Sequence, residues 1–247
     1  MKKQVTWVLA ICLTIFAIAI PGTANAWGPD VVVNPEPGHY YSAAKVSVSW
    51  DGTIYYGRLY STISTDGPMR VLEILKSTNN GSTFSNCLSF TLSGTERFTS
   101  FDMMAAGTDE SNFALFISRT SVNEIASNST IFLTRHTVGG GVMVLVNESY
   151  ASAHGWGSSC LTSDFRKKNY AADPYSVSLA AVKNDVLIDS VIAWTDNVGG
   201  LALNRVSVYG VAADIRNVSA AVGSVTAETS VFGRLGIVWD YYQLPTD

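Results

Sequence analysis

The chain has 247 residues, of which 47% are hydrophobic and 15% are charged, and its formal net charge is −4. This length is enough for one large domain or two small ones with a real hydrophobic core. The weak negative charge, with basic residues spread along the chain, argues against nucleic acid as a partner.

Residues 1–26 show the three zones of a secretory signal peptide. Lys2 and Lys3 come first, an apolar run follows, and the small residues Ala24 and Ala26 precede the expected cleavage site. The apolar run is short for a membrane span, and an uncleaved anchor is the alternative. We therefore expect an exported protein, secreted or periplasmic, whose mature domain covers residues 27–247 and has no membrane contact after cleavage.

Strand-like patterns follow one another through the mature chain. Alternating or β-branched runs include KVSVSW, TIYYGRLYS, MRVLEIL, NFALFIS, GVMVLV and DSVIAWT. Turn sequences such as DG, NNG and GGG separate these runs, and no run longer than about ten residues keeps a helical period. The pattern predicts an all-β fold.

A basic residue followed five positions later by glycine recurs between such runs. The three copies are Lys76 with Gly81, Arg135 with Gly140, and Arg205 with Gly210. A repeated unit of about four strands is typical of a β-propeller, of which about three and a half to four blades are visible. A β-sandwich is the competing fold.

Each unit of this repeat offers an inner strand and an aromatic-rich second strand. The predicted inner strands are KVSVSW, TSFDMMAA, YSVSLAAV and AVGSVTAE, and the predicted second strands are IYYGRLYS, FALFISRT, VIAWTDN and LGIVWDYY. An incomplete ring could close with the N-terminal stretch, belong to a longer propeller, or be completed by oligomerisation.

The octet STNNGSTF, at residues 77–84, has the chemistry of a hairpin turn. Asn79 can accept hydrogen bonds from local backbone N–H groups, and the Asn-Gly pair that follows it favours positive φ. Hydroxyl groups before and after it add hydrogen bonds, and an aromatic ring closes the octet. The residues expected to play these structural roles are Ser77, Asn79, Gly81, Thr83 and Phe84.

This octet resembles an Asp-box, or BNR repeat, of the sialidase-like β-propeller superfamily. Asn79 stands at the aspartate position and Phe84 at the tryptophan position, and the preceding VSVSWDGTIYYGRLYS is similar to strands of that superfamily. The resemblance implies a propeller whose Asp-box lies at the blade periphery, away from the active face. Family sialidases use an arginine triad, a tyrosine nucleophile with a glutamate, and an aspartate acid/base. Here no Arg-Ile-Pro stretch occurs and the first mature arginine is Arg58, so catalytic residues stay unassigned.

Residues 149–170 form the longest segment without clear alternation. Trp156, His154 and Arg166 lie in it and are candidates for ligand binding, because an exposed tryptophan beside polar groups can stack on a sugar. The alternative is an insertion pinned by Cys160. In an exported protein Cys87 and Cys160 can form a disulfide or remain free thiols.

The remaining motifs point to no cofactor and no metal. The chain has no CxxC, its three histidines are dispersed, and it contains no phosphate loop or dinucleotide fingerprint. The expected function is non-catalytic binding of glycans or of an extracellular protein. A sialidase-like glycoside hydrolase and a structural envelope or surface component are the alternatives, and oligomerisation stays open.

Overall fold

The computed structural model divides the chain into two compact units, Met1–Asn34 and Pro35–Asp247. The structure describes residues 36–107, 110, 113–151, 155–164, 176–184, 189–196, 203–212, 215–223 and 234–241, all in the second unit. The predicted signal peptide lies outside these residues. Among them, no helix is long and apolar enough to cross a membrane.

Fourteen strands make up the described fold, and the described residues contain no helix, which confirms the all-β prediction. The first sheet contains β1 (Tyr40–Val48), β2 (Ile54–Ser61), β3 (Val71–Ser77) and β4 (Ser85–Thr91). The second contains β5 (Glu96–Ala106), β6 (Ala114–Asn123), β7 (Asn128–Thr137) and β8 (Val142–Tyr150). The third contains β9 (Trp156–Asp164), β10 (Ser176–Lys183), β11 (Asp189–Asp196) and β12 (Leu203–Ala212), and the fourth contains β13 (Ile215–Gly223) and β14 (Arg234–Tyr241).

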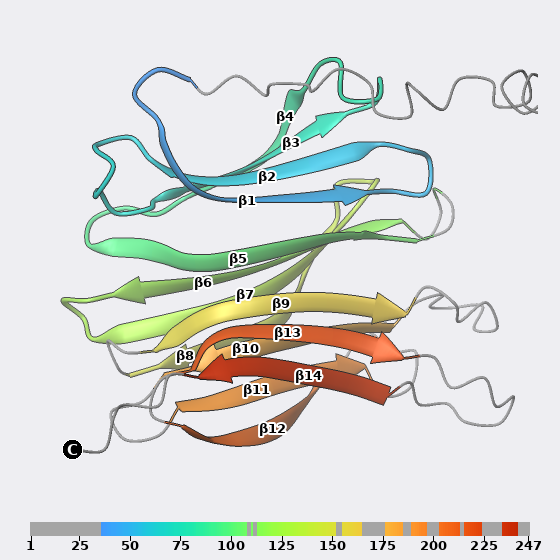
Figure 1. Ribbon diagram of the computed structural model, residues 1–247. Coiled ribbons are helices and arrows are strands. Elements are labelled where there is room, and N and C mark those ends of the chain that lie inside the picture. Colours follow the sequence, from blue (N-terminus) through green and yellow to red (C-terminus); the bar gives the residue numbers. More distant parts are fainter. Residues whose placement is uncertain are drawn as a thin grey trace, which may run out of the picture. The chain divides into compact units, whose positions relative to one another are not determined.

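Within each sheet, strands that are consecutive in the chain pair antiparallel (Figure 1). The first strands β1, β5, β9 and β13 therefore begin about 60 residues apart, which gives the period of the repeat. None of these four sheets closes on itself in the described residues.

The third sheet corrects the predicted strand order. YSVSLAAV corresponds to β10 and VIAWTDN to β11, so they are the second and third strands of their sheet and not the first and second. The first strand is β9, which lies in the segment that had shown no alternation. Ser159 in β9 is buried and meets the hydroxyl groups of Ser100 and Ser118, so its buried face is partly polar and gives no apolar period.

The basic-to-glycine repeat is structurally equivalent in two of its three copies. Lys76 to Gly81 spans the β3–β4 turn, and Arg135 to Gly140 spans the β7–β8 turn, so both connect a third strand to a fourth. Arg205 and Gly210 instead both lie within β12, so the prediction that they form a third copy of this turn was wrong. A basic residue and a glycine at this spacing also fit an ordinary strand.

Three apolar cores join consecutive sheets face to face. The core between the first and second sheets includes Leu59, Leu72, Phe101 and Ile117. The core between the second and third includes Phe116, Ile131, Leu179 and Trp194, and that between the third and fourth includes Val182, Val191 and Ile215. Each fully buried apolar side chain contributes about 1.5–3 kcal/mol.

Side chains of one sheet also accept hydrogen bonds from backbone N–H groups of the next sheet. The Ala105 N–H donates to Ser47 Oγ at 2.8 Å, which links β5 to β1. The Leu161 N–H donates to Asp102 Oδ2 at 2.8 Å, which links β9 to β5. The Ile215 N–H donates to Asp189 Oδ2 at 2.7 Å. Backbone groups without a ladder partner are thus satisfied by the neighbouring sheet.

Candidate functional site

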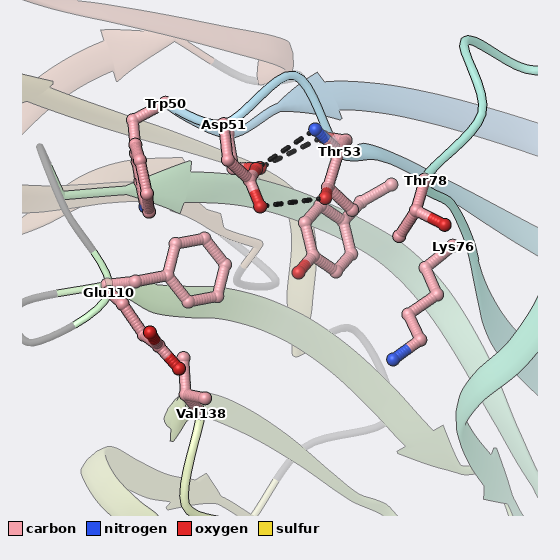
Figure 2. Close-up of a pocket in the computed structure, with 10 residues that line it drawn as sticks. Trp50, Asp51, Thr53, Lys76, Thr78, Glu110 and Val138 are labelled. Atoms are coloured by element: carbon pink, nitrogen blue, oxygen red, sulfur yellow. Dashed lines mark hydrogen bonds between the residues drawn. The ribbon is translucent and has the colours of Figure 1, made fainter.

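A pocket of about 370 Å³ lies where connections of the first and second sheets meet (Figure 2). In an antiparallel meander the β1–β2 and β3–β4 connections fall at the same end of the sheet, as do the β5–β6 and β7–β8 connections. All four contribute to the lining. The aromatic and apolar lining residues are Trp50, Tyr55, Phe113 and Val138, and the polar ones are Ser49, Asp51, Thr53, Lys76, Thr78 and Glu110.

The β1–β2 turn builds one wall of this pocket around Asp51. Asp51 Oδ1 accepts the Ser49 hydroxyl and, at 3.0 Å, the Thr53 N–H, while Oδ2 accepts the Thr53 hydroxyl at 3.1 Å. Gly52 supplies the positive φ of 83° that the turn requires. The Ser49 hydroxyl and the Thr53 N–H hold the pKa of the Asp51 carboxyl below its ordinary value. Asp51 is therefore ionised at neutral pH, and both of its carboxylate oxygens accept hydrogen bonds within the turn.

Aromatic rings form the apolar part of the lining. Trp50 is 50% exposed, whereas Tyr55 is half-buried and stacks on Phe113 with ring centroids 5.8 Å apart. Burial, followed by the proximity of Cys87 and Asp51, raises the pKa of Tyr55 to about 12. The phenol therefore stays protonated at neutral pH and can donate a hydrogen bond.

Lys76 and Glu110 are the charged lining residues that take no part in the β1–β2 turn. Both side chains are exposed, and neither takes part in an ion pair in the part of the chain that the structure describes. Figure 2 shows Trp50 and Lys76 on opposite sides of the pocket with Asp51 and Thr53 between them. A ligand in the pocket could thus contact an aromatic ring, an ammonium group and a carboxylate.

The octet at residues 77–84 forms the β3–β4 turn beside this pocket. Ser77 Oγ donates to Asn79 Oδ1 at 2.8 Å and accepts the Gly81 N–H at 2.9 Å. Asn80 and Gly81 have φ of 56° and 83°, and the Phe84 ring meets Tyr56 edge-on at 6.1 Å. These polar side chains bond to one another and to the turn backbone, which is a structural role.

Trp156, proposed from sequence as a stacking platform, is a core residue. It is only 3% exposed and packs on Trp194 at 5.5 Å between the second and third sheets. An exposed sugar-binding role for it was therefore wrong. The other two candidates of that segment, His154 and Arg166, lie outside the described residues.

The two cysteines do not form a disulfide. Cys87 in β4 and Cys160 in β9 are both free thiols. They belong to different sheets, one on a fourth strand and the other on a first strand, so the pairing that the sequence allowed is not made. No group of three or more metal-ligating side chains occurs in the described ranges.

Sequence reasoning missed the pocket, although one signal was present. Trp50 directly precedes the Asp-Gly turn that ends the first strand, and a side chain at such a strand end has few neighbours to cover it. Phe113 and Val138 come from other connections, and only the fold brings them together.

No protein family model matches the chain, and no curated protein matches it.

Proposed function

We propose that the four sheets are successive blades of a sialidase-like β-propeller. The repeated antiparallel order, the face-to-face cores and the Asp-box-like turn between β3 and β4 support this assignment. In such a fold the connections between strands are the parts free to carry ligand-binding side chains.

We infer that the protein is exported and binds a glycan without cleaving it. The observation that carries this proposal is the half-exposed Trp50 in a pocket that also holds Lys76 and Glu110. Aromatic rings receive the apolar face of a sugar, and a few convergent polar groups bind its hydroxyls and fix its orientation.

The pKa shifts of Asp51 and Tyr55 do not fit the roles of general acid and tyrosine nucleophile in glycoside hydrolysis. A glycosidase needs a carboxylic acid whose pKa is raised, whereas that of Asp51 is lowered by the turn. A sialidase-like mechanism also needs an activated tyrosine, whereas the pKa of Tyr55 is raised. Neither group is prepared for glycoside cleavage.

The proposal is tested by a glycan-array screen with a fluorogenic sialoside assay beside it. We expect binding to a defined set of glycans and no turnover of the sialoside. Turnover above background that disappears in Tyr55→Phe would contradict the non-catalytic assignment. Absence of both signals would favour the structural envelope role instead.

A further inference from the structure

Arg119 lies between two aromatic rings at the junction of the first and second sheets. Leu115 and Ile117 of β6 pack in the core that joins these sheets, so Arg119, two residues further along the strand, points to the same side. Its guanidinium carbon is 4.3 Å from the ring centroid of Phe90 in β4 and 4.9 Å from that of Phe132 in β7. The two rings hold the guanidinium in place through cation–π contacts.

No carboxylate balances the charge of Arg119 in the part of the chain that the structure describes. Its hydrogen bond there runs from Nη1 to the Thr134 hydroxyl at 3.4 Å, and none of the ion pairs includes it. Burial lowers the pKa of its guanidinium, which stays charged at neutral pH. Arg58, which is buried in the first sheet, is instead paired with Glu73 and Glu36. A cation withdrawn from water without an acidic partner is costly, and this cost calls for an anion.

One edge of this guanidinium is open to a ligand. Arg119 is partly buried, and neither Nε nor Nη2, which lack hydrogen-bond partners among the described residues, is fully buried. Val142 and Val144 of β8 lie on the same side of the sheet, because they pair with His136 and Thr134. They are 61% and 55% exposed, so this flank of the site is reached from solvent.

His136 is a second basic side chain beside Arg119. Its Nε2 lies 3.1 Å from the Thr134 hydroxyl, which also accepts the hydrogen bond from Arg119. Burial, and after it the charge of Arg119, lowers the pKa of His136. An anion bound to Arg119 would offset the second of these causes. The protonation of His136 therefore reports whether an anion is bound.

We propose that Arg119 is the centre of a binding site for an oxyanion, that is, for a carboxylate, phosphate or sulfate group of a ligand. Nε and Nη2 carry two parallel N–H bonds, and this fork matches two oxygens of such a group. Phe90 and Phe132 fix the plane of the fork. None of these residues lines the pocket at Trp50, so this site is independent of the proposed glycan binding.

Nuclear magnetic resonance titrations with sodium formate, phosphate and sulfate, at an ionic strength held constant with chloride, test this proposal. Two charge-assisted hydrogen bonds should give saturable binding of at least one of these anions, with a Kd of about 1 mM. We expect the pKa of His136, whose signal is assigned with His136→Gln, to rise at saturation. Preference for formate would identify a carboxylate ligand, and preference for phosphate or sulfate a tetrahedral one.

Arginine variants locate the bound anion. Arg119→Gln should weaken binding at least about tenfold, and Arg119→Lys, which keeps the charge without the fork, should also bind more weakly. Arg97→Gln is the matched control, because Arg97 is already paired with Glu124, and it should bind like the wild type. Absence of saturable binding, an unchanged pKa of His136, or wild-type affinity in Arg119→Gln would overturn the proposal. If Arg119→Gln loses its native circular dichroism spectrum, wild-type affinity in Arg119→Lys would overturn it instead.

Discussion

Asn79 holds Thr83 through two hydrogen bonds, one from the backbone and one to the side chain. The Thr83 N–H donates to Asn79 Oδ1 at 3.0 Å, and Asn79 Nδ2 donates to the Thr83 hydroxyl at 2.9 Å. Asp51 and Thr53 repeat this relationship at the β1–β2 turn, where Asp51 Oδ1 accepts the Thr53 N–H at 3.0 Å. The same side-chain chemistry thus closes two turns at one end of the first sheet.

Replacing Asn79 tests the structural role of the octet. Asn79→Ala removes the bonds to Thr83 and should lower the free energy of unfolding by about 1 kcal/mol. Asn79→Asp can still accept the Ser77 hydroxyl and the Thr83 N–H, and the Thr83 hydroxyl can rotate to donate to the new carboxylate. We therefore expect the free energy of unfolding to change by no more than about 0.5 kcal/mol. Urea denaturation measures both. An Asn79→Ala variant with native stability but no glycan binding would show that the octet is a site.

The Asp51 turn should make stability depend on acid pH. Because the folded-state pKa of Asp51 lies below its ordinary value of 3.8, its stabilising contribution is complete above that value and is lost as the pH falls through the folded pKa. Asp51→Asn cannot titrate, so the melting temperature of the wild type relative to this variant should fall as the pH drops below about 4. Asp66→Asn, which removes a carboxylate outside the turn, controls for net charge. A difference that is constant between pH 6 and pH 2 would contradict the prediction.

Two tryptophans should respond to truncation in opposite ways. Trp50→Ala should weaken glycan binding about tenfold with little change in melting temperature, because the ring is half exposed. Trp156→Ala should lower the free energy of unfolding by about 3–5 kcal/mol, because it empties part of a core. Thermal unfolding and calorimetric titration separate the two effects. Loss of stability in Trp50→Ala equal to that in Trp156→Ala would refute the assignment of Trp50 to the pocket surface.

Gly57 is required by the packing of the first sheet on the second. A Cβ at this position would lie 2.7 Å from Phe101 Cε2 and 3.0 Å from Met103 Sδ. Gly57→Ala should therefore cost about 1–3 kcal/mol of stability through overpacking. Gly139→Ala is the matched control, because a Cβ there meets no atom within 4 Å. Equal stability of the two variants would mean that the two sheets are not this closely packed.

Local chemistry made part of this fold predictable. β2 and β6 were found because runs rich in aromatic and aliphatic residues between turn sequences favour strands. The β3–β4 turn was found because Asn79 and Gly81 satisfy the requirements of a turn by themselves. β9 was missed because Ser159 on its buried face bonds to hydroxyls of the second sheet. Its polarity resembles that of a loop.

The candidate site was less predictable than the strands. Trp156 has glycine and serine neighbours that suggested a surface loop, whereas tertiary packing buries it against Trp194. Trp50, Lys76 and Phe113 come from separate connections, and their spacing along the chain does not encode that they converge on one pocket. Convergence is a property of the packed sheets.

The proposal that the pocket binds a glycan is tested most directly by one glycan array probed with the wild type, Trp50→Ala and Ile125→Ala. Ile125, which is 79% exposed in the β6–β7 turn and outside the pocket, provides the control. We expect the wild type and Ile125→Ala to bind the same glycans with equal strength, and Trp50→Ala to lose about tenfold in affinity for all of them. Binding by Trp50→Ala at the wild-type level, or no binding by the wild type to any glycan, would contradict the account.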